Sequence, residues 1–244
     1  MIDWLLRKTE DPTVTIAGRE LPLAIRRHPR ATRLTMRLAP DGSEVRITLP
    51  RWGRTSDAMV FASKRVDWLE QQLAAVPAAL PPAPGGTVQH RGRTVLIEWK
   101  PAGARKPKLA GDRLHLGGPW ETVPSRVRRW LEAEALHLLC GDLSHYCARA
   151  GVPLPQLRLS RATRRWGSCS GTNEAGACIR INWRLVQAPD EIRRSVVAHE
   201  VAHLVHFDHS PAFRALLGEL FEGDLKAADS WLKREGRGLY GAFG

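Results

Sequence analysis

The feature that most constrains this chain is the stretch His199-Glu200-Val201-Ala202-His203. Residues four apart on an α-helix lie one turn apart on the same face, so His199 and His203 can each offer a ring nitrogen to one metal ion. Glu200 leaves the helix at a different angle, from which it can reach a water bound to that metal. A lone histidine on a helix is more often an ordinary polar residue. Two histidines around a glutamate at this spacing instead favour the zinc site of a hydrolase, although the five-residue pattern by itself is only moderately specific.

The flanking residues predict a helix around the motif and a bend after it. The segment Pro189–Glu191 is typical of a helix start, because proline fits the first turn and acids favour the positive end of the helix dipole. Ser210 followed by Pro211 predicts the start of the next helix. The residues between the two helices therefore form a bend.

Two histidines compete for the role of third ligand. If the helix continued, His206 would bring a third ligand two turns from His199, about 10 Å along the axis, which is too far for one tetrahedral zinc ion. His209 lies at the predicted bend, from which it can turn back toward the first two histidines. We therefore expect His199, His203 and His209 as ligands, with His206 supporting a ligand or lining the pocket.

This ligand set predicts a mechanism. Three neutral imidazoles leave the fourth position of zinc for water, and Glu200 is the expected general base that takes the proton of that water. A second group should stabilise the oxyanion that develops on the substrate. The sequence offers four candidates without ranking them: Arg164, Arg165, Ser168 and His206.

Three further motifs accompany the histidines in a fixed order. They are Arg165-Trp166-Gly167-Ser168-Cys169-Ser170, Ile181-Asn182-Trp183-Arg184-Leu185 and the pair His209-Ser210. Together with the His-Glu motif they resemble the signature of the YgjP-like metallopeptidase family, which is grouped with the SprT-like and WLM small zincins. The resemblance implies a zinc peptidase in which His199, His203 and His209 bind the metal and Glu200 is the base. It also implies that the family domain covers most of the chain from about residue 20 onward.

Periodicity predicts an α+β fold, with a strand-rich N-terminal half followed by a zincin-like catalytic core that contains the active-site helix. We expect strands on both sides of a turn at Pro40–Ser43, one helix from Ser56 to about Val76, and further hairpins at Arg91-Gly92 and Gly111-Asp112. A long helix is predicted over Pro124–Ala150, and strands over Leu157–Ser160 and Cys178–Trp183. Either the last strand or the segment Trp166–Ser170 should line the cleft and pair with an extended peptide.

The expected organisation has four parts. They are an N-terminal extension (1–19), a strand-rich part of the family domain (20–122), the catalytic core (123–236) and a C-terminal tail (237–244). The Pro- and Ala-rich stretch 77–86 is predicted to be a loop.

Composition limits the partners and the compartment. The net charge is +12, and residues 1–120 hold 20 Lys and Arg against 11 Asp and Glu, compared with 17 against 14 in residues 121–244. This excess allows a nucleotide or nucleic-acid partner, but a solvated arginine-rich surface is the favoured interpretation because no nucleic-acid-binding motif accompanies it.

We expect no membrane span and no secretory signal, hence a cytoplasmic protein whose cysteines, including Cys169 and Cys178, are thiols.

Three functions follow from these features. The favoured one is a zinc metallopeptidase that cleaves peptide or protein substrates. The second is a metal-dependent nucleoside triphosphate pyrophosphatase, an activity linked to the resembled family, although the sequence has no glycine-rich phosphate loop and no acidic magnesium cluster. The third is a nucleic-acid-associated protease or a non-catalytic zinc module, and Glu200 argues against the latter because a structural site needs no base.

Overall fold

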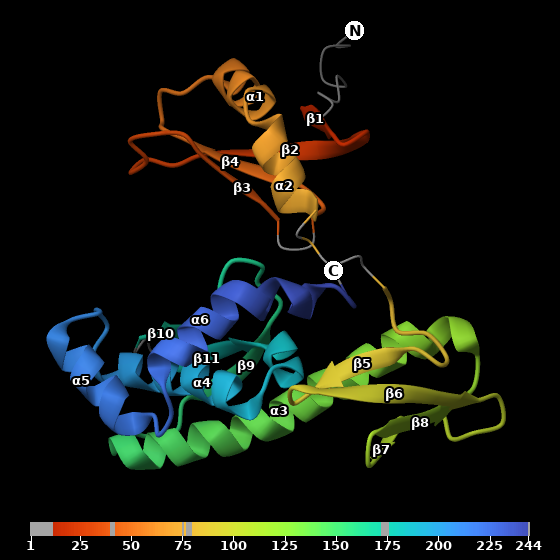
Figure 1. The fold of residues 1–244 in the computed structure, drawn as a ribbon. Coiled ribbons are helices and arrows are strands. Elements are labelled where there is room, and N and C mark those ends of the chain that lie inside the picture. The colour runs from red at the N-terminus through yellow and green to blue at the C-terminus, as the bar shows by residue number, and fades with distance from the viewer. Residues whose placement is uncertain (1–11, 40–41, 75, 77–79, 172–175, 244) are drawn as a thin grey trace, which may run out of the picture. The chain divides into compact units, whose positions relative to one another are not determined.

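The computed structural model describes residues 12–39, 42–74, 76, 80–171 and 176–243. The chain forms two compact units that divide between Ala78 and Ala79 (Figure 1). This division lies in the stretch predicted to be a loop, of which residues 77–79 lie outside the described residues. Also outside are residues 1–11 of the expected N-terminal extension, Pro40 and Asp41 of the predicted turn, and Gly244 of the expected tail.

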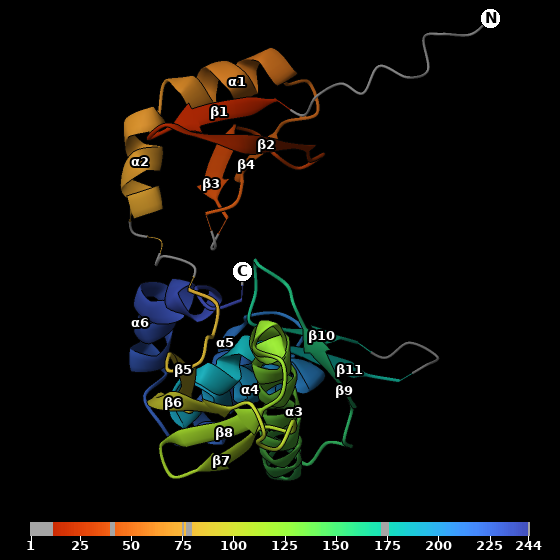
Figure 2. The same cartoon turned by 90° about the vertical axis from the view of Figure 1, so that its right-hand side faces the viewer.

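The N-terminal unit is a four-stranded sheet with two helices. The sheet has the order β1-β2-β4-β3, in which β2 and β4 are parallel and the other pairs antiparallel. The two helices lie on one face of the sheet (Figure 2). The elements are β1 (Thr13–Ile16), β2 (Arg19–Arg27), β3 (Thr35–Leu38), β4 (Val45–Leu49), α1 (Thr55–Ser63) and α2 (Val66–Ala74).

The alternation of buried and exposed residues along the strands explains why the helices cover one face of the sheet. In β4, Val45, Ile47 and Leu49 are buried while the residues between them are partly exposed, as expected for a sheet with one covered face. The prediction of one helix from Ser56 to Val76 is wrong, because α1 ends at Ser63 and α2 begins at Val66. The break lets each short helix turn its own buried residues, such as Leu69 of α2, onto the same core.

The C-terminal unit begins with a second four-stranded sheet of order β5-β6-β8-β7. Its two predicted hairpins are confirmed, since β5 pairs antiparallel with β6 and β7 pairs antiparallel with β8. In the first hairpin, Arg91 and Gly92 have φ values of 52° and 74°, the left-handed conformations that a tight two-residue turn requires. The strands are β5 (Thr87–His90), β6 (Arg93–Lys100), β7 (Lys108–Ala110) and β8 (Arg113–Gly117).

The rest of this unit consists of helices around a small mixed sheet. The predicted long helix is confirmed as α3, which is capped by Gly151 in the left-handed conformation (φ 65°) typical of the residue after a helix. The sheet has the order β10-β11-β9, so β11 is central and β10 is an edge strand. The elements are α3 (Val123–Ala150), β9 (Gln156–Ser160), β10 (Gly167–Ser170), β11 (Cys178–Asn182), α4 (Asp190–Val205), α5 (Pro211–Leu220) and α6 (Leu225–Glu235), with short 3-10 helices η1 (Trp120–Thr122), η2 (Trp183–Gln187) and η3 (Gly236–Tyr240).

Helix α4 is the centre of the C-terminal unit, where it packs against α3, α5, α6 and the three-stranded sheet (Figure 2). Its residues Val197, Val201 and Ala202 are almost fully buried in a core that extends to the β5–β8 sheet. That sheet, which the sequence grouped with residues 20–122, thus belongs to the same compact unit as the metal-binding motif. The predicted α+β fold is confirmed. Over the described residues, no helix is both long and apolar enough to cross a membrane.

Candidate metal centre

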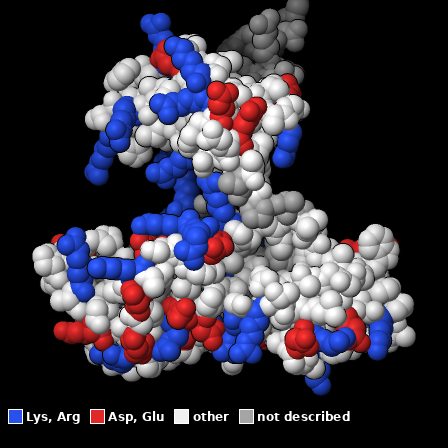
Figure 3. Space-filling model, in the orientation of Figure 1, with Lys and Arg blue, Asp and Glu red and all other residues white. Residues whose placement is uncertain are grey.

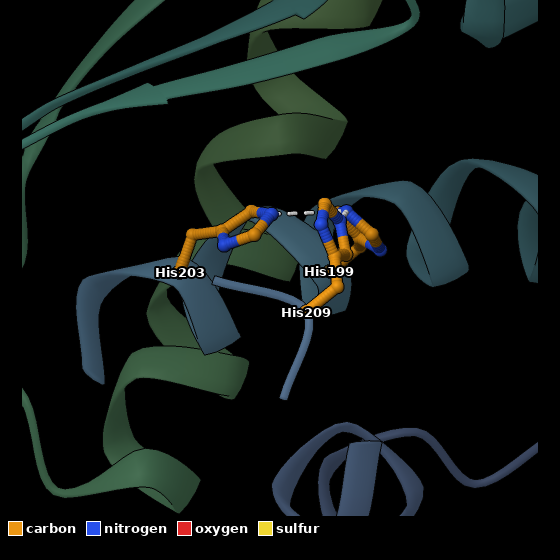
Figure 4. Close-up of side chains that lie close together, drawn as sticks. All are labelled: His199, His203 and His209. Atoms are coloured by element: carbon orange, nitrogen blue, oxygen red, sulfur yellow. Dashed lines mark hydrogen bonds between the residues drawn. The ribbon is translucent and has the colours of Figure 1, made fainter. Parts of the chain in front are cut away.

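Helix α4 and the bend after it bring the three expected ligands together (Figure 4). His199 and His203 lie one turn apart on α4, and the helix ends at Val205 because His206 adopts an extended backbone (φ −127°, ψ 109°). The chain then turns, and His209 comes back beside the first two rings. His199, His203 and His209 form a group whose ligand atoms all lie within 4.8 Å of one another.

The spacing of the nitrogens fits a tetrahedral metal ion. The Nε2 atom of His199 lies 3.2 Å from that of His203 and 3.3 Å from that of His209. Nitrogens bound at about 2.0–2.1 Å in tetrahedral geometry are separated by about 3.4 Å. Three imidazoles that leave a fourth position open suit zinc better than magnesium or calcium, which prefer oxygen ligands. The residues present therefore fit a catalytic zinc site.

The ring of His203 is oriented by the end of its own helix. Its Nδ1 atom lies 3.0 Å from the carbonyl oxygen of His206, to which a protonated Nδ1 donates a hydrogen bond. This bond leaves the Nε2 lone pair of His203 pointing toward the other histidines, as metal-binding imidazoles require. His206 thus contributes its backbone oxygen to the site.

Phe213 supports all three histidines, a role that the sequence did not suggest. Its ring is 2% exposed and stacks on His203 at a centroid distance of 4.5 Å, with His199 and His209 each 5.0 Å away. Ser210 caps the start of α5, its side chain accepting a hydrogen bond from the backbone N–H of Phe213. The sequence carries two signals for Phe213: the predicted cap at Ser210, which fixes where Phe213 lies on its helix, and a spacing typical of core residues.

The expected base is buried beside these ligands. Glu200 is 6% exposed. Burial raises its pKa to about 7, although a hydrogen bond from the backbone N–H of Cys169 and the charge of Arg165 lower it in part. Burial also lowers the pKa of His199 to about 4, with further lowering by His203 and His209, so its imidazole is neutral at pH 7. Neutral histidine is the form that binds metal.

Strand β10 passes so close to Glu200 that any side chain at Gly167 would displace the carboxylate. A Cβ atom placed on Gly167 would lie 2.4 Å from Oε1 of Glu200, far inside van der Waals contact. The same strand supplies the backbone N–H of Cys169 to this carboxylate. The edge strand therefore fixes the position of Glu200.

The other residues of the sequence motifs hold this strand in place. Trp166 packs against Tyr240 with a ring distance of 5.7 Å. The buried side-chain amide of Asn182 donates to the carbonyl of Ala162 at 2.8 Å and to the hydroxyl of Tyr240 at 3.2 Å. These contacts tie the segment before β10 to the C-terminal end of the chain.

The four candidates for oxyanion stabilisation are not equally placed. Arg165 lines the cleft with Glu200 and His199, whereas Arg164 is exposed and does not line it. Ser168 alternates with Gly167 and Cys169 along β10, so its side chain lies on the sheet face away from Glu200. His206 contacts His203 through its backbone oxygen, and its side chain does not line the cleft.

The cleft beside Glu200 and His199 has a volume of about 460 Å³. Much of its wall is apolar and comes from α4, α5 and α6, with Arg165 and Asp229 as its other charged residues. The apolar lining consists of Trp166, Val196, Leu217, Leu225 and Leu232.

Comparison with protein families identifies this arrangement. The model described as YgjP-like, metallopeptidase domain, matches residues 32–235, which is most of the chain. The chain therefore belongs to the YgjP-like family of metallopeptidase domains. The match begins in the N-terminal unit and ends at the last residue of α6. Comparison with curated proteins and with solved structures gives no match.

Proposed function

We propose that this protein is a zinc-dependent metallopeptidase whose general base is Glu200. The observation that carries the proposal is the tetrahedral spacing of the His199, His203 and His209 nitrogens beside a buried carboxylate. Membership of a metallopeptidase family supports it independently.

The proposed reaction uses proton transfer at one carboxylate. A zinc ion bound by the three histidines would lower the pKa of a water to near 7 and polarise the carbonyl of the scissile bond. Glu200 accepts the proton of that water through a carboxylate oxygen and then delivers it to the leaving amine. Arg165, at the rim of the same cleft, is the cation best situated to stabilise the developing oxyanion.

Edge strand β10 is the proposed docking site for the substrate backbone. Central strand β11 has neighbours on both sides, so of the two predicted segments β10 is the one whose second edge has no strand partner among the described residues. An extended peptide that pairs antiparallel with β10 makes the more stable type of ladder. Because β10 runs from Gly167 toward Ser170, the C-terminal side of such a peptide lies at the Gly167 end, over the apolar cleft. This supports a preference for an apolar side chain just after the scissile bond.

The cleft gives less support to the other functions considered. Arg165 is the only cationic side chain among the described residues that line it, and four leucine and valine side chains face the same space. A triphosphate would need several cations or a magnesium site there. The charge of the chain as a whole supplies no specific nucleic-acid contact at the site.

Hydrolysis by zinc-loaded protein, measured beside its Glu200→Gln variant, tests the proposal. The substrates are a denatured protein, a DNA-bound protein and nucleoside triphosphates, and zinc content is measured in both samples. We expect cleavage of the denatured protein to fall at least 10³-fold in the variant while zinc content stays the same, because the amide cannot accept a proton. Retained cleavage would contradict the role of Glu200, and triphosphate hydrolysis alone would overturn the peptidase proposal.

A further inference from the structure

A second pocket in the C-terminal unit is lined by cations. It has a volume of about 550 Å³ and lies between the first turns of α3 and the loop that follows β6. Four basic side chains line it, and no acidic side chain among the described residues does so: Arg105, Lys106, Arg126 and Arg129. This composition differs from the face of the C-terminal unit drawn in Figure 3, where basic and acidic side chains are interspersed.

These cations have no counterion within the described parts of the chain. None of the four forms an ion pair with a described carboxylate, although most other ion pairs of this unit involve arginine. Arg126 is only 8% exposed, and its guanidinium donates to the carbonyl oxygens of Arg105, Gly117, Pro119 and Thr122. Neutral carbonyls fix this cation without neutralising it, so the pocket carries positive charge that an anionic ligand would balance.

Apolar side chains also line the pocket. They are Pro107 and Trp130, which are partly buried, and Pro119 and Ala133, which are exposed. A site lined by both apolar and cationic side chains fits a ligand with one apolar group between acidic groups. A nucleic-acid strand is a poorer fit, since it needs cations along a longer track and exposed rings for successive bases.

None of the residues that line this pocket lines the cleft at the metal centre. Arg126 and Arg129 are in the first turns of α3, whereas the three histidines come from α4 and the bend after it. The pocket is therefore a second site, separate from the one described above.

We propose that this pocket binds an acidic polypeptide segment through one apolar side chain flanked by carboxylates. We further infer that the segment belongs to the substrate, because the pocket lies on the same compact unit as the metal centre. This second statement rests on the proposed peptidase function, whereas the binding itself does not. The pocket would then raise the affinity for chosen substrates through a second point of attachment.

Binding is tested with the full chain carrying Glu200→Gln and loaded with zinc, so that turnover plays no part. The probe is a fluorescein-labelled peptide of six glutamates around a central leucine, followed by fluorescence anisotropy. Arg129→Glu, an exposed change in the pocket, should weaken binding at least tenfold. Arg158→Glu makes the same charge change on an exposed residue of β9, outside the pocket, and should weaken it less than twofold. Replacing the leucine of the peptide with alanine should cost roughly fivefold.

Several outcomes would overturn the proposal. Equal weakening by both variants would mean nonspecific attraction, and no weakening by either would mean that the peptide binds elsewhere. Binding of a single-stranded oligonucleotide or of inorganic tripolyphosphate that depends on Arg129, without peptide binding, would assign the pocket another ligand. With active protein, a substrate carrying the acidic segment should show a raised KM and an unchanged kcat in the Arg129→Glu variant. If peptide binding depends on Arg129 but the protein cleaves no peptide, the proposed peptidase function is wrong and the proposed ligand of the pocket still stands.

Discussion

The two ends of helix α4 differ in whether their buried charged side chains have ion-pair partners. At its start, Arg193 is 3% exposed and pairs with both Asp142 and Asp190, while Arg194 pairs with Glu222. In its C-terminal half, Glu200 is buried without a cation in ion-pair contact among the described residues. Charges at the start of the helix are thus compensated by partners, whereas the carboxylate beside the three histidines has no such partner, which suits its proposed role as a general base.

The pKa values of the two ends reflect this difference. Burial alone would raise the pKa of Asp190, but hydrogen bonds from Arg91 and Arg193 outweigh it and bring the pKa to about 2. For Glu200 burial prevails, and its pKa rises to about 7. The same helix therefore holds one carboxylate firmly ionised and another near the middle of its titration at neutral pH.

The largest expected effect is a loss of stability when the buried arginine at the start of α4 is removed. Arg193→Met leaves two carboxylates without their buried partner and should destabilise the C-terminal unit by about 3–5 kcal/mol. Lys233→Met removes a single exposed pair with Asp229 and serves as the control, with an expected cost below about 1 kcal/mol. Urea unfolding followed by circular dichroism measures both, and equal losses would contradict the distinction.

The second-largest expected effect is a loss of activity when the carboxylate of Glu200 is displaced. In Gly167→Ala the new methyl group displaces Glu200 from beneath β10, and kcat/KM should fall about 10²-fold, or about 2.7 kcal/mol, with zinc content unchanged. Gly141→Ala is the matched control, because no atom lies within 4 Å of the added Cβ in the middle of α3. Full activity of the Gly167→Ala variant would show that the contact does not position the base.

The smallest expected effect concerns acid stability. Because the pKa of Asp190 in the folded state is below its unfolded value near 4, its contribution is fully present above pH 4 and is lost as pH falls toward 2. Asp190→Asn should remove that part of the acid dependence and lower stability at pH 7 by about 1 kcal/mol, a figure reduced for the partial exposure of the side chain. Unfolding midpoints between pH 2 and 7 test this, and an unchanged slope below pH 4 would refute it.

Local patterns account for what the sequence could predict. The spacing of His199 and His203, the cap at Ser210 and the bend before it all act within a few residues, and the structure brings His209 to the first two histidines as expected. Long-range packing accounts for the rest. Nothing near Gly167 in the sequence indicates that it lies against Glu200, and Phe213 has the spacing of any core residue until its ring is seen beneath three imidazoles.

The division of α1 from α2 has the same origin. The apolar spacing from Ser56 to Val76 suits one long helix, yet the helices separate at Lys64 and Arg65, and Val60 is left 52% exposed. Whether this segment forms one helix or two depends on the shape of the core beneath it. The residues of the segment alone do not encode that shape.

The closeness of the three ligands along the chain has a consequence for folding. His199, His203 and His209 lie within eleven residues, so closing that loop around an ion costs little chain entropy and needs little of the remaining fold. The burial of Glu200 under β10 instead joins residues 33 positions apart through the whole sheet. If these histidines are the zinc ligands and Glu200 is the base, as proposed, a partly unfolded chain would hold its full equivalent of zinc without a working base, and metal content would be a poor measure of native protein.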